Sequence, residues 1–421
     1  MRLVVLASIA PDFRHFRAGQ TVLAEIIEAL SIQGVQLTVA LAGHQNDLDG
    51  TQVARLELKG ITIADSQSFN INHEFKQNQL KWKIRQVRSV LQSGEDCDFF
   101  GFIDPDKAAD EIADLKPDAV LLFWDTYFEH ILPNLIHRGI ECFAYSAKPR
   151  QASGLSSLGT FKSTMHKLMQ RLQLNAAQKR HVERYKLLKD SRNICDLDCS
   201  WYARQGVHVK YLSNTWPDPY GEDWQQKRLT SESKRAGVNI LANIGGLNAT
   251  GNTFGLQYLA DKIMPILINK MSREWAVNIC GRFEMPKYLK EALKDPHVKL
   301  LGFVDDIDDE VIGNEIFMLL NNAGPFTGGY TRVMYAFSAG ACLVGHSKLS
   351  LSTPELVSGQ NCLLADTPEE IAEYAMRAAR DPALRLQIGT AARQTYDEYF
   401  KPSTIAREIR QMIDSGISNA K

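Results

Sequence analysis

The sequence predicts an α/β protein made of two doubly wound domains. Apolar runs typical of buried strands alternate with amphipathic helices along the N-terminal half. The C-terminal half repeats this alternation and places glycine-rich loops next to its predicted strands. With 421 residues, 44% of them apolar, the chain is long and apolar enough to bury two cores.

The N-terminal half should form a parallel sheet covered by helices. Apolar strand-like runs occupy residues 3–7, 35–40, 119–124 and 141–145, and helices are expected at 21–32, 105–115 and 128–137. Asp104 is suited to cap the second helix, and Pro105 to its first position. Because ligands bind at the carboxyl ends of parallel strands, catalytic candidates should follow these runs.

The predicted domain boundary lies within residues 213–224, where two prolines and a glycine interrupt regular structure. This division predicts an N-terminal domain of residues 1–215 and a C-terminal domain of residues 216–401.

A glycine-rich loop followed by a helix dominates residues 324–344. Backbone N–H groups of Gly328 and Gly329 can point at an anion at the helix start, and Arg332 can add a bidentate contact. Gly340 suits the end of that helix, before the apolar run 341–344. An ordinary strand-to-helix turn whose glycines only permit the turn is the alternative.

Another glycine loop lies earlier in the chain, at Gly245 and Gly246, after the predicted strand that starts at Val238. We call it the first glycine loop, and the loop at Gly328 and Gly329 the second. A helix is expected after the first loop, at 253–264. This first loop has neither the Gly-x-Gly-x-x-Gly spacing of dinucleotide-binding proteins nor the Gly-Lys-Ser/Thr of a Walker A loop. Simple NAD-binding and ATP-hydrolysing functions are therefore disfavoured.

Further segments match a known family in order. The run 275–282 ends in Gly-Arg, 298–306 contains Gly-Phe-Val, 335–344 reads Tyr-Ala-Phe-Ser-Ala-Gly-Ala-Cys-Leu-Val, and 355–371 closes with Pro-Glu-Glu-Ile. Over about residues 236–400 the chain resembles the C-terminal domain of GT-B glycosyltransferases, especially the family 4-like group. The resemblance implies two Rossmann-like domains facing across a cleft, with a final helix in 402–421 packing back on the first domain.

The resemblance also implies a donor site in the C-terminal domain. It would hold a nucleotide-sugar, with a UDP-sugar favoured, and would need no metal ion or further cofactor because helix starts and arginines neutralise the leaving diphosphate. The donor-site residues predicted in this way are Gly245, Gly246, Asn248, Arg282, Phe303, Val304, Gly328, Gly329, Thr331, Arg332 and Tyr335.

One departure from the family pattern concerns two glutamates that retaining members usually carry eight positions apart. Thr327 and Tyr335 occupy those positions here, so neither carboxylate is present. The Tyr335 hydroxyl can still bond a ribose, although a neutral partner contributes less than a charged one. Packing beneath the loop is the alternative role for Tyr335.

The acceptor-side base is expected after strands of the N-terminal domain. Asp125 follows the run 119–124, and His15 lies in the loop after the first strand. Asp125 can instead cap the next helix, and His15 can be a solvated loop residue. Tyr145, Lys148 and Arg150, which follow the next strand, are weaker candidates.

Charge and composition limit the partners. A net charge of −1 argues against nucleic acid. The chain has no apolar run of about 18 residues and no signal-peptide pattern, so we expect a cytoplasmic protein.

Basic residues with interleaved leucines at 159–192 suit peripheral contact with an anionic membrane, or simply a solvated helix. Cys195 and Cys199 lack the further ligands of a metal site, and the seven cysteines suit reduced thiols.

The expected function is transfer of a sugar from a nucleotide-sugar to a glycan or lipid-linked acceptor, in polysaccharide biosynthesis. Two alternatives remain open at this point. One is a nucleotide-sugar epimerase of the same architecture. The other is a non-catalytic subunit that supports a partner transferase, which the absent glutamates favour.

Overall fold

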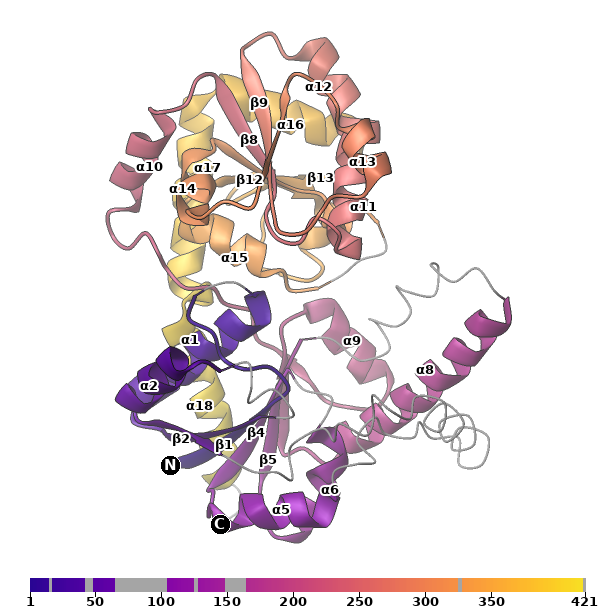
Figure 1. The fold of residues 1–421 in the computed structure, drawn as a ribbon, viewed down its shortest axis with the longest axis vertical. Coiled ribbons are helices and arrows are strands. Elements are labelled where there is room, and N and C mark those ends of the chain that lie inside the picture. The colour runs from indigo at the N-terminus through magenta and orange to yellow at the C-terminus, as the bar shows by residue number, and fades with distance from the viewer. Residues whose placement is uncertain are drawn as a thin grey trace. The chain divides into compact units, whose positions relative to one another are not determined.

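A computed structural model describes residues 1–14, 17–41, 48–64, 104–124, 128–147, 164–324 and 328–418. The chain divides into two compact units, Met1–Ser213 with Pro402–Lys421, and Asn214–Lys401 (Figure 1). This division lies two residues from the boundary expected after residue 215. Each unit is built around its own parallel sheet, so the predicted fold class is confirmed.

The N-terminal unit contains a seven-stranded sheet in the order β3-β2-β1-β4-β5-β6-β7, parallel throughout. The strands are β1 (Arg2–Ala7), β2 (Gln36–Leu41), β3 (Ile61–Ala64), β4 (Ala119–Phe123), β5 (Cys142–Ser146), β6 (Asp190–Asn193) and β7 (Lys210–Tyr211). The helices are α1 (Ala18–Ile32), α2 (Gly50–Leu58), α5 (Pro105–Asp114), α6 (Leu132–His137), α8 (Thr164–Tyr185), α9 (Asp196–Arg204) and α18 (Pro402–Ser418), with a 3₁₀ turn η3 (Phe128–Ile131).

Residues of the central strands pack into a hydrophobic core of this unit. Val4, Leu6, Val120 and Leu122 pack with α5, η3 and α6 on one face. The helices α1 and α18 pack against each other within the same unit. The expected cap of α5 is present, because the Asp104 carboxylate accepts from the N–H groups of its first turn.

The C-terminal unit contains a six-stranded parallel sheet in the order β10-β9-β8-β11-β12-β13. The strands are β8 (Val238–Asn243), β9 (Trp275–Cys280), β10 (Val298–Gly302), β11 (Ile316–Leu319), β12 (Cys342–His346) and β13 (Leu363–Ala365). The helices are α10 (Trp224–Glu232), α11 (Thr250–Tyr258), α12 (Met264–Lys270), α13 (Lys287–Ala292), α14 (Ile307–Gly313), α15 (Thr331–Ser338), α16 (Pro368–Arg380) and α17 (Pro382–Thr395).

Both sheets reverse their strand order at one place. The order turns between β1 and β4 in the first unit and between β8 and β11 in the second. Loops leave such a reversal in opposite directions and open a crevice at the carboxyl ends of the strands. In the C-terminal unit, this reversal places the loops after β8 and β11 at the expected binding edge.

The helix after the first glycine loop differs from the one expected at 253–264. It begins earlier, at Thr250, and continues through a π-helical turn, η5 (Leu259–Ile263), into α12. Helix α15 ends as expected: its C-cap is Ala339, and Gly340 follows with a φ of +58°. A Cβ at Gly340 would lie 2.1 Å from the Trp224 ring, so the turn needs glycine both for its conformation and for its packing.

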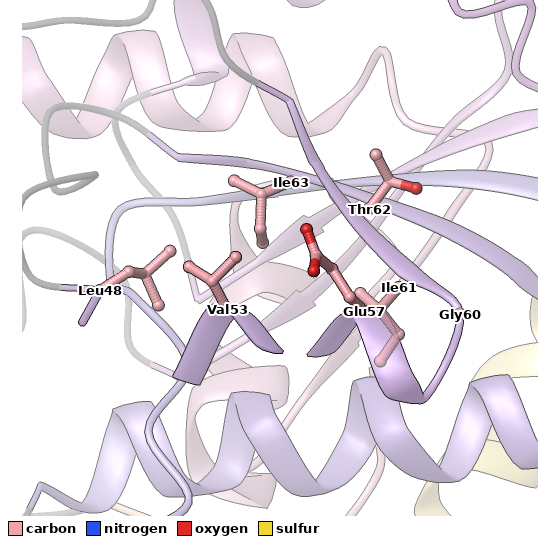
Figure 2. Close-up of a pocket in the computed structure, with 7 residues that line it drawn as sticks. All are labelled: Leu48, Val53, Glu57, Gly60, Ile61, Thr62 and Ile63. Carbon is pink, nitrogen blue, oxygen red and sulfur yellow. The ribbon is translucent and has the colours of Figure 1, made fainter. Parts of the chain in front are cut away.

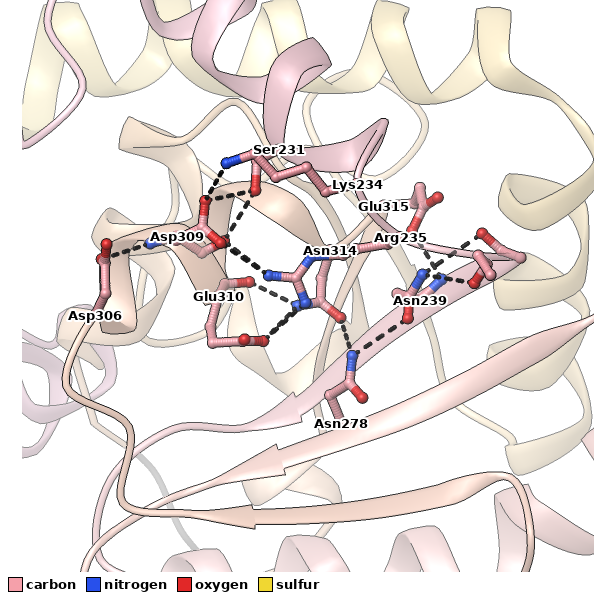
Figure 3. Close-up of polar contacts among 12 residues, drawn as sticks. Ser231, Lys234, Arg235, Asn239, Asn278, Asp306, Asp309, Glu310, Asn314 and Glu315 are labelled. Carbon is pink, nitrogen blue, oxygen red and sulfur yellow. Dashed lines mark hydrogen bonds and ion pairs between the residues drawn. The ribbon is translucent and has the colours of Figure 1, made fainter.

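A network of polar side chains ties α10 and α14 to the sheet (Figure 3). The Arg235 guanidinium donates to Glu310 at 3.0 Å and to the Asp309 carboxylate at 3.3 Å. The Asn278 amide on β9 donates to Asn314 Oδ1 at 2.7 Å, and the Asn314 amide donates to the Glu310 carbonyl at 2.6 Å. Asn278 and Asn314 are buried, whereas Arg235, Asp309 and Glu310 are partly exposed. Because these groups satisfy one another, this part of the unit is a structural polar network.

Candidate donor site

Three loops are joined by backbone hydrogen bonds at the carboxyl edge of the C-terminal sheet. The Leu247 N–H, after β8, donates to the Arg282 carbonyl, after β9, at 2.8 Å. The Gly281 N–H donates to the Gly302 carbonyl, at the end of β10, at 2.7 Å. The loops that follow three neighbouring strands therefore form one connected surface.

Two positions in this surface require glycine, one because the backbone approaches closely and the other because of its backbone conformation. A Cβ at Gly281 would lie 1.9 Å from the Gly245 carbonyl oxygen. Gly245 has a φ of +106°, which residues with a side chain rarely adopt. Gly246 is different, because a Cβ there would make ordinary contacts with the Phe283 ring, at 3.4 Å, and with Asn248 Oδ1, at 3.6 Å.

Asparagines hold the first glycine loop from the side of β11. The Asn252 amide donates to the Gly246 carbonyl at 2.8 Å, and the Asn321 amide donates to Asn252 Oδ1 at 2.9 Å. Asn248, one of the predicted site residues, is exposed. The loop is thus held by the neutral side chains of Asn252 and Asn321. Neither side chain adds a negative charge that would repel an anion at this loop.

The second glycine loop departs from expectation. Both Gly328 and Gly329 are buried, and the Gly328 N–H donates to the Ser352 hydroxyl at 3.3 Å. The Gly329 carbonyl accepts from the Asn214 amide at 2.8 Å. The idea that the Gly328 N–H points at an anion is therefore wrong for this structure, because Ser352 already uses that donor. Helix α15 begins at Thr331, and Tyr330 provides no side-chain cap.

Arg332 lies in the first turn of α15 and is partly buried. Its Nη1 lies 3.5 Å from Asn243 Oδ1, and its guanidinium lies 5.5 Å from the centre of the Tyr330 ring. Within the part of the chain that the structure describes, no carboxylate forms an ion pair with it. Burial lowers the pKa of Arg332 to about 10, so the side chain stays charged at neutral pH.

Tyr335 fits the packing alternative rather than a ribose contact. Its side chain is 3% exposed, and its hydroxyl donates to the Asp308 carboxylate. The ring packs 5.2 Å from Trp216 and 6.4 Å from Tyr220, centre to centre. Burial also raises the pKa of Tyr335 well above its usual value, so it is not a base. The expected ribose contact is corrected on this ground.

The remaining predicted donor residues follow β9 and β10. The Arg282 guanidinium lies over the Phe303 ring, 4.8 Å from its centre, and Phe303 is 54% exposed. Val304 is partly buried. These side chains belong to the same joined surface as Gly245 and Gly246.

The acceptor-side candidates are mostly outside the described residues. Asp125, His15, Lys148 and Arg150 all fall there, as does Thr327. Tyr145 is described and is fully buried, with its hydroxyl donating to the Ser213 carbonyl at 2.8 Å. Burial raises the pKa of Tyr145 well above its usual value, which removes it as a base.

Two other features, a hollow beside β3 and the thiol of Cys199, do not provide a site for a nucleotide-sugar or a metal ion. A hollow beside the edge strand β3 is lined by Leu48, Val53, Glu57 and residues 60–63 (Figure 2). None of these described lining residues is an arginine or lysine that could hold a diphosphate. Burial raises the pKa of the Cys199 thiol to about 12, and no group of three metal-ligating side chains occurs in the described ranges.

Residues 238–381 match the family model described as glycosyl transferases group 1. This part of the chain is therefore similar to the group 1 glycosyltransferases. No curated protein matches the chain in sequence. The matched range contains every predicted donor residue, so the resemblance inferred from the motifs is confirmed, as is the prediction that the protein is a glycosyltransferase.

Solved structures similar to the chain span nearly its whole length. A glycosyltransferase from Rickettsia africae is 12% identical, with 99% of both chains covered and a TM-score of 0.65. HepE from Anabaena, in complex with UDP, is 12% identical, covering 99% of this chain and 100% of its own, with a TM-score of 0.63. The α,α-trehalose 6-phosphate synthase from Burkholderia multivorans is 12% identical, covering 100% of this chain and 99% of its own, with a TM-score of 0.65. At these identities the likeness shows the fold, which is GT-B.

The matched range has one prominent residue that the sequence reasoning missed. Phe283 follows Arg282 directly, is 68% exposed and has a φ of +68°. An aromatic residue after a Gly-Arg strand end was the available signal, but its unusual backbone conformation has no sequence signature. As for membranes, none of the described helices combines the length and apolar character needed to cross a bilayer.

Proposed function

We propose that the protein transfers a sugar from a nucleoside-diphosphate sugar, with a UDP-sugar favoured, to a glycan or lipid-linked acceptor. The observation that carries this proposal is Arg332, a partly buried cation without a carboxylate partner among the described residues, in the first turn of α15. A buried charge is costly unless it is paired, and the diphosphate of a donor would pair it.

Structural neighbours support the choice of donor. HepE has been crystallised with UDP and with UDP-glucose, and TarM from Staphylococcus aureus with UDP and α-GlcNAc-glycerol. A trehalose-phosphate synthase from Burkholderia vietnamiensis is described as UDP-forming. These ligands belong to those proteins, and we carry only the class of donor over to this chain.

The proposed chemistry needs no metal ion. Negative charge that develops on the leaving diphosphate would be stabilised by the Arg332 guanidinium and by the N-terminal dipole of α15. We further propose that the acceptor binds to the N-terminal unit, where Asp125 or His15 removes the proton of its hydroxyl. The two positions that carry glutamates in retaining family members hold Thr327 and Tyr335, so this chemistry proceeds without that carboxylate pair.

The test is an incubation of the protein with UDP-, GDP-, dTDP- and CMP-sugars, with and without acceptor glycans, and with EDTA. Release of UDP and transfer of the sugar, unaffected by EDTA, are the expected results. Interconversion of the sugar without an acceptor would identify an epimerase instead. Binding of the nucleotide-sugar without any turnover would identify a non-catalytic subunit. Asp125→Asn and His15→Ala should both keep donor affinity, and one of them should lose most of the transfer.

A further inference from the structure

We propose that Phe283 is the platform on which the nucleobase of the donor stacks. This inference rests on the proposed function and adds a binding residue that neither the family motif nor the sequence reasoning singled out. Three observations carry it: the backbone conformation of Phe283, its exposure, and its position beside the first glycine loop.

The backbone of Phe283 is held in a conformation that side-chain-bearing residues avoid. Only three non-glycine residues in the described ranges have a positive φ, and Phe283, at +68°, has the largest. Bulky aromatic residues pay for this conformation, so it persists where the surroundings enforce it, and such sites cluster at ligand-binding positions. The hydrogen bond from the Leu247 N–H to the carbonyl of the preceding residue is one contact that fixes it.

Exposure of the ring is the second observation. Phe283 is 68% exposed, although a phenylalanine gains about 1.5–3 kcal/mol when it is fully buried. Single exposed aromatics are common on proteins, and exposure alone means little. An exposed aromatic in a strained conformation at the carboxyl edge of a doubly wound sheet is a different case, because the ligand crevice opens at that edge.

The position of the ring links it to the donor. It lies against Gly246, where an added Cβ would be 3.4 Å from Phe283 Cδ2. The same connected surface carries Arg282, stacked over Phe303. Under the proposed function the phosphates lie at Arg332, which is 3.5 Å from Asn243 at the end of β8, and we place the base at the aromatic residues beside the glycine loop that follows this strand.

The chemistry of phenylalanine defines what is recognised. The ring offers a π-face and no hydrogen-bonding group, so it stacks on any base and does not distinguish one base from another. Phe283 should therefore raise the affinity for nucleoside diphosphates as a class. It should contribute nothing to the binding of pyrophosphate, which has no base.

The experiment compares UDP, GDP and inorganic pyrophosphate by isothermal titration calorimetry. Phe283→Gly removes the ring and relieves the positive φ, so the variant should fold at least as well as the wild type. We expect its affinity for UDP and GDP to fall by roughly tenfold to a hundredfold, and its affinity for pyrophosphate to stay unchanged. Phe283→Trp should retain binding of both nucleotides.

A matched control is Tyr288→Ala, which removes another exposed aromatic, 61% exposed, from α13 of the same unit. It should bind all three probes like the wild type. If Phe283→Gly binds UDP and GDP as tightly as the wild type while Arg332→Ala does not, the stacking proposal fails and the donor assignment stands. If the wild type binds none of the three probes, both fail.

Discussion

Arg332 is the cation on which the proposed donor site depends most. The pKa of Arg332 is lowered by burial, and its hydrogen bond to Asn243 is at the limit of hydrogen-bond length, at 3.5 Å. The Arg332 guanidinium is therefore available to bind an anion. It differs in this from surface cations such as Lys186, which already pairs with Glu183.

Replacing Arg332 by alanine should weaken UDP binding and sugar transfer. Loss of a charged hydrogen bond costs about 1.5–3 kcal/mol, or roughly ten- to a hundredfold in transfer efficiency. Arg273→Ala is a suitable control, because this exposed arginine precedes β9 at the opposite end of the strand. Unchanged nucleotide affinity and turnover in Arg332→Ala would remove the basis of the proposed function.

Gly281 has a structural role that can be separated from binding. A Cβ there would collide with the Gly245 carbonyl, so Gly281→Ala should destabilise the protein by about 1–3 kcal/mol and displace the glycine loop. Gly50→Ala is the control, since no atom lies within 4 Å of its added Cβ and its stability should change little. Urea unfolding of the two variants measures the difference; equal midpoints would show that the backbone approach is not as close as described.

At the scale of elements, an ion pair connects the start of the C-terminal unit to α17 and α15. Arg393 donates to both oxygens of Asp218, at 3.0 and 2.5 Å, and to the Ser338 carbonyl at 2.7 Å. Arg393 is 4% exposed. Burial acts to raise the pKa of Asp218, but the hydrogen bonds from Arg393 and from the Gly221 and Tyr220 N–H groups, together with the Arg393 charge, outweigh burial and hold that pKa below its ordinary value of 3.8.

Breaking this pair should be costly. Arg393→Met leaves Asp218 without its partner and should destabilise the protein by roughly 3–5 kcal/mol. In the wild type, Asp218 binds its proton more weakly when folded than when unfolded. Its contribution to stability is therefore present above pH 3.8 and is lost as the pH falls through the lowered native pKa. Thermal unfolding from pH 5 to pH 2 should show a smaller loss in Asp218→Asn than in the wild type; identical slopes would contradict the assignment.

The elements that the sequence predicted well are those with a strong apolar pattern. The strands β1, β2, β4 and β5 and the helix α5 lie within a residue or two of their expected places. Strand β6 was missed because its residues, Asp190–Asn193, are polar and take part in the sheet through their backbone. Local pattern carries no information about such pairing, which depends on the neighbouring strand.

The site shows the same limit. Glycine loops at strand ends were visible in the sequence, because parallel sheets bind ligands there. The partner of the Gly328 N–H was not, since Ser352 lies 24 residues away and meets the loop only in the folded chain. The Tyr335 hydroxyl was assigned to a ribose for the same reason: nothing local indicates that Asp308 lies beside it.

For the whole molecule, the basic stretch 159–192 stays a prediction of reversible contact with anionic membrane. Of its described side chains, Arg180 is buried, and Lys186, Lys189 and Arg192 have carboxylate partners. Arg171 and Lys179 are exposed. Each basic residue near an anionic leaflet contributes about 1 kcal/mol, so binding should be salt-sensitive.

Liposome co-sedimentation at low and high ionic strength measures this contact. The protein should sediment with anionic vesicles at low salt and be released at high salt, and the double variant Arg171→Glu with Lys179→Glu should bind at least tenfold more weakly, an order-of-magnitude expectation. Neutral vesicles are the control. A protein that stays in the supernatant with anionic vesicles at low salt has only a solvated basic face.

The helix α18 gives the N-terminal unit a dependence on the end of the chain. Its buried residues, among them Ile405, Ile409 and Ile413, complete the packing around α1, and a Cβ at Gly416 would strike the Phe143 ring. During synthesis, α18 therefore emerges from the ribosome only after the C-terminal unit, so the rest of the N-terminal unit is made before this helix is available. The apolar face of α1 stays exposed while the C-terminal unit is synthesised. We expect chaperones to bind the nascent chain at this surface.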